Sequence, residues 1–90
     1  MTWEIEYTET AQRQLAGLDK RAAKSIKRYL DERIGTDEDP RRFGDPLKRD
    51  WAGLWKYRVG VFRIIVEIQE DRVVVLVVRL GHRSKVYGGH

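Results

Sequence analysis

The chain has 90 residues, of which 41% are hydrophobic and 36% are charged, and its formal net charge is +4. This length and balance are those of one folded domain over residues 1–90, and they argue against a disordered chain. The absence of cysteine excludes a disulfide framework, a thiolate metal site and a cysteine nucleophile. The chain begins with no basic segment followed by an apolar run, and its longest apolar run, residues 73–78, is too short to cross a bilayer. We therefore expect a cytoplasmic protein.

The positive charge is unevenly distributed along the chain. Residues 1–45 hold nine basic and ten acidic side chains, whereas residues 46–90 hold nine basic and four acidic ones. A basic region of this kind is typical of a domain whose partner is a polyanion, most often nucleic acid. The alternative is that the charge serves solubility alone.

The first elements predicted along the chain are a short strand and a short helix. From Trp3 to Tyr7, apolar residues alternate with Glu4 and Glu6, which is the pattern of a half-exposed strand. Thr8 can then cap a helix, because its hydroxyl can accept a hydrogen bond from a backbone N–H of the first turn. Apolar residues recur at helical spacing at positions 11, 15 and 18, and a break is expected at positions 17–19.

A second, longer helix is predicted to begin at Asp19. Ile26, Leu30 and Ile34 form its apolar stripe, and Gly35 stands where a left-handed C-terminal cap is usual. The basic residues that lie away from this stripe are Lys20, Lys24, Lys27 and Arg28. We interpret them as a solvated helix face rather than as dedicated phosphate contacts.

Residues 36–53 form a long connection that holds both prolines and two glycines. Loops of this length in compact domains are commonly functional. We expect Leu47 and Trp51 to pin the connection to the core, and Lys48 and Arg49 to approach the start of the following strand.

Three β-rich runs follow, with breaks at Gly60 and at Glu70-Asp71, and they predict a meander of antiparallel strands. Because alternate side chains of a strand share a face, the first two runs each place apolar residues on one side. That side carries Trp55, Tyr57, Val59, Phe62, Ile64, Val66 and Ile68. The other side collects the cations Lys56, Arg58 and Arg63.

The third run, Val73 to Leu80, is apolar on both sides and predicts a central strand that is covered at least partly on both faces. Alternation is expected to place Val73, Val75 and Val77 beside Ile65 on the cationic face, which then calls for a substrate or a protein partner. The predicted fold class is α+β. It is a two-layer sandwich of strand, helix, helix and three-stranded antiparallel meander, with the helices on one face of the sheet.

Several segments of the chain resemble the RelE/ParE toxin superfamily. They are Gly-Asp-Pro-Leu-Lys at 44–48, Leu-Trp-Lys-Tyr-Arg-Val-Gly-Val-Phe-Arg-Ile-Ile-Val-Glu-Ile at 54–68 and Gly-His-Arg-Ser-Lys-Val-Tyr at 81–87. The resemblance extends over nearly the whole chain and implies the toxin of a type II bacterial or archaeal toxin–antitoxin pair. In this superfamily the RelE branch cuts messenger RNA in the ribosomal A site, and the ParE branch poisons DNA gyrase.

The resemblance also implies partners and a chemistry. A cognate antitoxin protein would neutralise the toxin, and the toxin–antitoxin complex would bind operator DNA through the antitoxin. The substrate would be messenger RNA on the ribosome, beside the 16S rRNA of the A site, and no membrane would be involved. RelE-like enzymes are thought to direct the 2′-hydroxyl at the adjacent phosphate, which gives a cyclic phosphate and a 5′-hydroxyl and needs no metal or other cofactor.

Transferred residue by residue, the resemblance implies a set of catalytic residues on the meander and the tail. The set is Lys56, Arg58, Arg63, His82, Arg83 and Tyr87. Its cations suit the dianionic phosphorane that develops in this reaction, and the ring of Tyr87 can stack on a base. Further contacts with RNA or the ribosome are expected from Lys48, Arg49, Arg79 and Lys85.

One position departs from the superfamily's pattern. The best-known RelE site has a lysine as general base where this chain has Arg58. Arginine stays protonated at any ordinary pH, so it makes a poor base and a good electrostatic clamp. Either Lys56 or His82 would then accept the proton. Two rival interpretations stay open, a ParE-like gyrase inhibitor and a catalytically weak toxin-fold protein that only binds its antitoxin.

Overall fold

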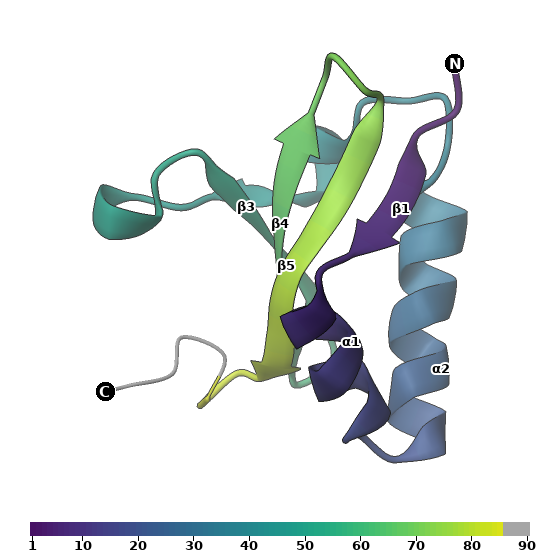
Figure 1. The fold of residues 1–90 in the computed structure, drawn as a ribbon, viewed down its shortest axis with the longest axis vertical. Coiled ribbons are helices and arrows are strands. Elements are labelled where there is room, and N and C mark those ends of the chain that lie inside the picture. The colour runs from purple at the N-terminus through teal and green to yellow at the C-terminus, as the bar shows by residue number, and fades with distance from the viewer. Residues whose placement is uncertain (86–90) are drawn as a thin grey trace.

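The computed structural model describes residues 1–85, which form a five-stranded sheet with two helices packed on one face (Figure 1). The elements are β1 (Glu4–Tyr7), α1 (Glu9–Ala16), α2 (Lys20–Tyr29), β2 (Asp45–Pro46), β3 (Leu54–Val59), β4 (Phe62–Gln69) and β5 (Val74–His82). The strand order is β1-β5-β4-β3-β2, with β1 parallel to β5 and the other neighbours antiparallel. The predicted α+β sandwich is therefore confirmed, with β2 as an additional short edge strand. Within residues 1–85, no helix is long and apolar enough to span a membrane.

Both helices begin at the predicted caps. The Thr8 hydroxyl accepts a hydrogen bond from the Ala11 N–H at 3.1 Å, and the Asp19 carboxylate accepts one from the Ala22 N–H at 2.8 Å. Each cap satisfies a backbone donor that the helix itself leaves without a partner. These two side chains thus fix where the helical layer starts.

The end of α2 differs from the prediction. The helix continues into one π turn, Leu30–Ile34, and the Gly35 N–H bonds to the Leu30 carbonyl at 2.7 Å. Gly35 has φ −76°, so the predicted left-handed cap is wrong. A Cβ at this position would lie 3.3 Å from the Asp31 carbonyl oxygen, a tight contact, so glycine suits the close approach of the backbone here.

The core lies between the helices and the sheet. Its buried members are Ala11, Ile26, Leu30, Ile34, Tyr57, Ile64, Val66, Val75, Val77 and Leu80. The long connection is pinned to this core by Pro40, which is fully buried and whose carbonyl accepts a hydrogen bond from the Tyr57 hydroxyl at 2.7 Å. The predicted pins, Leu47 and Trp51, are only partly buried and do not belong to the core cluster, so that prediction is wrong.

A β-bulge in β5 corrects the predicted faces of this strand. Ile65 pairs with Arg79, whereas the next residue of β4, Val66, pairs with Val77, so Val78 is an extra residue. One extra residue reverses the alternation of everything before it. Val75 and Val77 therefore lie in the core rather than on the cationic face, and Val73 precedes the strand altogether.

Ile65 does lie on the cationic face, but it is 0% exposed. Its neighbours across the sheet are Lys56 on β3 and Arg79 on β5. The expected open apolar surface at this position is therefore absent, and long cationic side chains flank the isoleucine instead.

Candidate active site

Four cations project from the sheet face opposite the helices. Arg58 on β3 pairs directly with Arg63 on β4. Two residues along the strands, Lys56 and Arg79 stand on either side of Ile65. Side chains in directly opposed positions have Cβ atoms about 5 Å apart, so this face concentrates positive charge in a small area. The sequence had predicted this gathering for Lys56, Arg58 and Arg63, and the sheet register brings them together.

Arg63 is held at the β3–β4 turn. Its guanidinium donates hydrogen bonds to the Gly60 carbonyl at 3.2 Å and to the Phe62 carbonyl at 3.0 Å. The turn itself depends on Gly60, whose φ of +60° is the left-handed value that a two-residue hairpin with glycine at its first position needs. Backbone geometry therefore sets the place of the Arg63 charge.

Arg58 and Lys56 face the edge strand β2. The Arg58 guanidinium lies 3.8 Å from the Asp45 carboxylate, and Lys56 is the register partner of Asp45. The Arg58 and Asp45 side chains are both mostly exposed, so this ion pair contributes little to stability. Its effect on the site is local, since one carboxylate offsets part of the positive charge at the β2 side.

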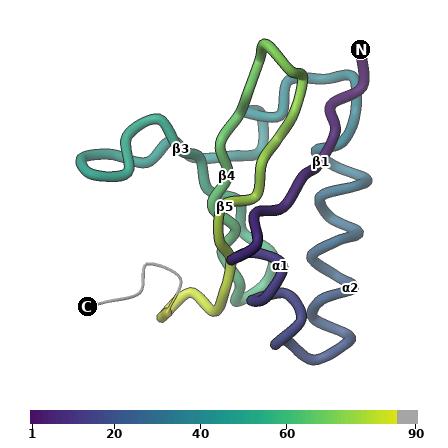
Figure 2. Tube along the Cα trace, viewed as in Figure 1, coloured from purple at the N-terminus to yellow at the C-terminus, as the bar shows by residue number. Residues whose placement is uncertain are grey.

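Arg79 contacts the ring of Trp51. Its guanidinium carbon lies 5.6 Å from the centre of the Trp51 ring, within the range of a cation–π interaction. Its Nε is buried without a hydrogen-bond partner. Trp51 comes from the 3₁₀ turn Arg49–Trp51, and the connection that carries it projects on the side of the sheet away from the helices (Figures 1 and 2). Arg79 thus ties the connection to the cationic face.

Lys48 and Arg49 lie on the same projecting connection, and both side chains are exposed. Arg49 has φ 57°, a left-handed conformation that is uncommon for a residue with a Cβ. The connection is closed by a hydrogen bond from the Leu47 N–H to the Leu54 carbonyl at 2.9 Å. These two cations therefore extend the basic surface beyond the sheet rather than joining the four on it.

The structure separates His82 from these cations. Its register partner is Phe62, a residue packed against the core, and the two rings meet edge to face with centroids 6.4 Å apart. Alternation therefore places the imidazole on the helix side of the sheet. Arg83 follows it and donates its backbone N–H to the Val61 carbonyl at 2.7 Å. The side chains of Arg83 and Lys85 are exposed, and Tyr87 lies outside the described residues.

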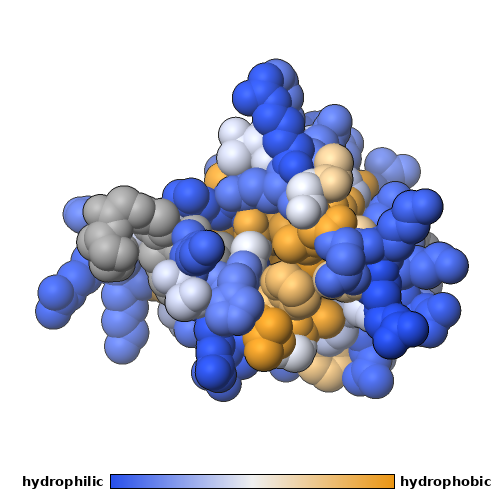
Figure 3. Space-filling model, turned by 90° about the horizontal axis from the view of Figure 1, so that it is seen from below, coloured by the Kyte–Doolittle hydropathy of each residue, from blue (hydrophilic) through white to orange (hydrophobic). Residues whose placement is uncertain are grey.

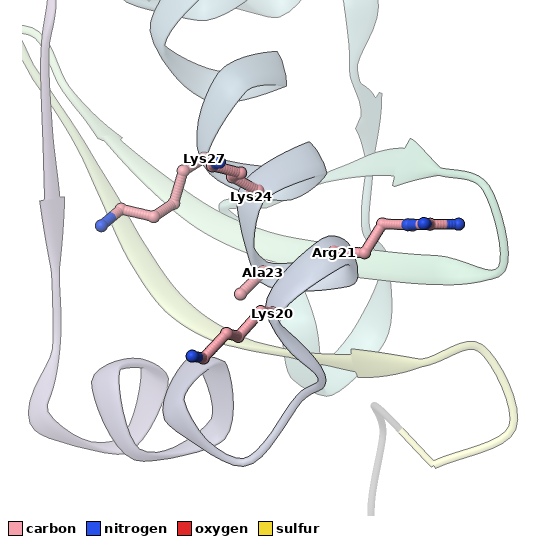
Figure 4. Close-up of a pocket in the computed structure, with 5 residues that line it drawn as sticks. All are labelled: Lys20, Arg21, Ala23, Lys24 and Lys27. Carbon is pink, nitrogen blue, oxygen red and sulfur yellow. The ribbon is translucent and has the colours of Figure 1, made fainter.

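Grooves occur elsewhere, on the helical layer. One of about 510 Å³ is lined by Lys20, Arg21, Ala23, Lys24 and Lys27. Figure 4 shows Lys20 and Lys27 pointing to the same side of α2, and Arg21 to the opposite side. A second groove of about 420 Å³ is lined by Tyr7, Gln12, Leu15, Ala16, Ala23 and Lys27. At the end of the molecule that holds the α1–α2 and β3–β4 turns, apolar surface is exposed among hydrophilic residues (Figure 3). These features suit a polypeptide partner better than a phosphate.

Two residues near the cations were missed by sequence reasoning as parts of the site. The sequence predicts Trp51 as a contact with the core, although the run Lys48-Arg49-Asp50-Trp51 places an aromatic residue near two basic ones, a combination that RNA-binding surfaces use. Asp45 had no assigned role, and no local signal marks it. Its place beside Arg58 and Lys56 follows only from the pairing of β2 with β3.

Comparisons with known proteins identify the family of the chain. The family model described as the ParE toxin of the type II toxin–antitoxin system, parDE, matches residues 5–87. Toxin RelG of Mycobacterium tuberculosis is similar, with 29% identity over 87 residues that cover 97% of this chain and 98% of that protein.

Solved structures give the same result for the fold. The toxin–antitoxin complex RelBE2 of Mycobacterium tuberculosis contains a similar chain with a TM-score of 0.85 and 27% identity, covering 94% of this chain and 95% of that one. An archaeal RelE–RelB complex from Pyrococcus horikoshii has a TM-score of 0.71 and 21% identity, covering 96% of this chain and all of the other (100%). At that identity the likeness concerns the fold alone.

Proposed function

The chain belongs to the ParE toxin family within the RelE/ParE superfamily, so it is a toxin of a type II toxin–antitoxin system, and we propose that it cleaves messenger RNA on the ribosome without a metal. The observation that carries this proposal is the opposed pair Arg58 and Arg63, flanked by Lys56, on one open face of the sheet. A surface of this kind is suited to a phosphate that gains charge during reaction.

The proposed reaction is attack by a ribose 2′-hydroxyl on the adjacent phosphorus. The bond to the 5′-oxygen breaks, and the products are a 2′,3′-cyclic phosphate and a 5′-hydroxyl. One proton leaves the 2′-oxygen and one is added to the 5′-oxygen, so the reaction consumes no other reactant. Arg58 and Arg63 stabilise the phosphorane as fixed cations, because guanidinium groups match phosphate oxygens and stay charged. Arg83 and Tyr87 complete the set, on the tail, as substrate contacts.

Lys56 is our proposed proton acceptor. Arg58 cannot serve, and the imidazole of His82 faces the helix side of the sheet, whereas a general base must come within hydrogen-bond reach of the proton that it removes. Lys56 is on the cationic face, two residues from Arg58 and partly buried beside Ile65. Lys48, Arg49, Arg79 and Lys85 are proposed to act in binding of RNA or the ribosome.

A cognate antitoxin is the proposed protein partner, since the similar structures from Mycobacterium tuberculosis and Pyrococcus horikoshii are toxin–antitoxin complexes. One groove is lined mainly by basic side chains and the adjoining one mainly by apolar side chains, and they share Ala23 and Lys27, so together they suit an amphipathic, acidic segment. We place the antitoxin on this helical layer rather than on the sheet face, because the apolar residues expected on that face, Ile65 and Val75, are buried.

A second candidate function is inhibition of DNA gyrase. The observation in its favour is the family model itself, whose description is that of the ParE toxin. A gyrase inhibitor has no need of a cationic constellation on the sheet, which is why we place RNA cleavage first.

A pulse of expression in cells, followed by mapping of new RNA 5′ ends, tests the proposal. We expect new 5′-hydroxyl ends within translated messages. The Arg63→Ala variant should lose them, and the control Arg13→Ala should keep them, because Arg13 is an exposed cation on α1 that pairs with Glu9. Trapped gyrase–DNA complexes without new RNA ends would favour the second candidate. If neither effect is seen and the protein still forms a tight complex with its antitoxin, antitoxin binding would be its only function.

A further inference from the structure

The chain leaves β5 through a tight turn that His82 closes with its own side chain. The Ser84 N–H donates to His82 Nδ1 at 3.2 Å, and the Ser84 hydroxyl lies 2.9 Å from the same nitrogen. The Lys85 N–H donates to the His82 carbonyl at 2.8 Å, as in a β-turn. Two acceptors of His82, its Nδ1 and its carbonyl oxygen, therefore organise residues 82–85.

This arrangement is the one that asparagine and aspartate make in an Asx turn, where the side chain accepts a hydrogen bond from the backbone N–H two residues later. An imidazole can do so only while Nδ1 is unprotonated, with its proton on Nε2. Phe62 fixes the other side of the ring through their edge-to-face contact. The imidazole thus contacts Phe62 on one side and accepts the hydrogen bond from the Ser84 N–H on the other.

Arg83 lies inside this turn. The Arg83 N–H bonds to the Val61 carbonyl at 2.7 Å, so the backbone of Arg83 is joined to the β3–β4 turn. Arg63 is hydrogen-bonded to that same turn at Gly60 and Phe62. The Arg83 backbone is therefore held at two places, by the Val61 carbonyl at the β3–β4 turn and by the turn of residues 82–85 in which it lies.

We infer that His82 is a positioning residue, which acts through the Ser84 N–H to place Arg83 beside the cationic face, and that it does not move the proton. The role for Arg83 in cleavage rests on the proposed function, whereas the turn itself does not. Two observations carry the inference. The imidazole lies on the opposite side of the sheet from Lys56, Arg58 and Arg63. Its Nδ1, the nitrogen free to accept a proton when Nε2 carries one, is already occupied by Ser84.

The chain offers a substitution that separates the two roles. In His82→Asn, the amide oxygen can take the place of Nδ1 as acceptor for the Ser84 N–H, but an amide cannot act as a general base. His82→Gln keeps an amide but moves its oxygen one bond further, and His82→Ala removes the acceptor. A positioning role predicts that Asn alone rescues, and a base role predicts that none of the three does.

The first measurement is backbone amide exchange at Ser84 by NMR on the full chain, which requires no RNA. We expect wild type and His82→Asn to exchange alike, and His82→Ala and His82→Gln to exchange about tenfold faster, as loss of one hydrogen bond implies. Equal exchange rates in all four proteins would overturn the inference. This measurement stands even if no protein cleaves RNA, so it distinguishes failure of the inference from failure of the proposed function.

The second measurement is single-turnover cleavage of ribosome-bound messenger RNA. We expect His82→Asn to stay within about threefold of wild type and the other two variants to fall by about tenfold, since they lose the same hydrogen bond. An inactive His82→Asn with a protected Ser84 amide would overturn the positioning role and assign His82 to the chemistry.

Discussion

Arg58 and Arg63 are directly opposed on neighbouring strands, so two guanidinium groups share one face of the sheet without an acidic residue between them in the register. Like charges in such positions destabilise an antiparallel pair. Asp45 near Arg58 and the turn carbonyls around Arg63 offset part of the repulsion. A phosphorane bound between the two arginines would offset the rest. The repulsion between the two arginines would therefore be smaller with a highly charged phosphate bound than without one.

Substitutions at Arg58 test this division of roles. We expect Arg58→Lys to preserve or raise the cleavage rate, because it keeps a cation and adds a possible base. Arg58→Ala should lower the rate through lost phosphorane stabilisation, by about 3 kcal/mol, or on the order of a hundredfold. Single-turnover cleavage on the ribosome measures both, with Arg13→Ala as the matched control. A lysine variant as slow as the alanine variant would show that the guanidinium geometry, not the charge, is what matters.

Because the two arginines repel each other, removing one of them should not lower the stability of the fold, although it should abolish cleavage. Arg63→Ala should unfold at the same or a slightly higher denaturant concentration than wild type, within about 0.5 kcal/mol, although it should be inactive. Equilibrium urea unfolding of both proteins gives the comparison. A loss of stability above about 0.5 kcal/mol would mean that the hydrogen bonds from Arg63 to the turn carbonyls outweigh the repulsion.

The projecting connection should govern the salt dependence of RNA binding. Each phosphate contact contributes about 0.7 to the slope of log affinity against log salt for a single strand. If Lys48 and Arg49 both contact phosphate, their replacement by glutamine should reduce the slope by about 1.4 and leave cleavage at saturating substrate intact. Binding to ribosome-bound message is measured from low to moderate salt. An unchanged slope would remove these two residues from the contact surface.

Most of the fold follows from local sequence pattern. Thr8 and Asp19 predict where the helices start. The alternation of apolar and polar residues from Trp55 to Ile68 predicts the two faces of β3 and β4. The faces of β5 could not be predicted, because Val73 to Val78 is apolar throughout and no residue type marks Val78 as a bulge. If the faces of β5 are assigned by alternation from Arg79 towards the start of the strand, the assignment is correct only as far as the bulge at Val78.

The candidate site was predictable to the same extent. Lys56, Arg58 and Arg63 follow from alternation and from the family pattern, because they lie on adjacent strands joined by a short turn. Trp51 and the side of the sheet that His82 faces depend on tertiary placement. Both required the register of β5 and the path of the connection, which local pattern does not encode.

The contact between Trp51 and Arg79 should be measurable as a coupling. A double-mutant cycle with Trp51→Ala and Arg79→Ala is expected to give an interaction energy of about 0.5–1 kcal/mol in urea unfolding, the usual value for a partly exposed cation–π pair. Arg79→Lys should keep less than half of it, because lysine lacks a planar group to stack. Additive effects of the two alanine substitutions would show that the contact contributes no stability.

Tyr57 should make the fold sensitive to alkaline pH. Burial, with smaller effects from Tyr29 and Asp39, holds the pKa of Tyr57 well above the ordinary range of a tyrosine. The folded state therefore keeps the phenol proton when the unfolded chain loses it, near pH 10. The stabilisation is complete below that pH and is lost as pH rises towards the folded-state pKa, by up to about 1.4 kcal/mol per pH unit.

Tyr57→Phe separates this effect from the hydrogen bond. At neutral pH the variant should lose about 1–2 kcal/mol, because the buried Pro40 carbonyl loses its donor at 2.7 Å. Above about pH 10 the variant should lose stability more slowly than wild type, so the two curves converge. Tyr7 and Tyr29, whose pKa values burial also raises, supply the slope that remains. Urea unfolding at several pH values between neutral and strongly alkaline gives both curves. Parallel curves would mean that Tyr57 ionises in the folded protein as easily as in the unfolded chain.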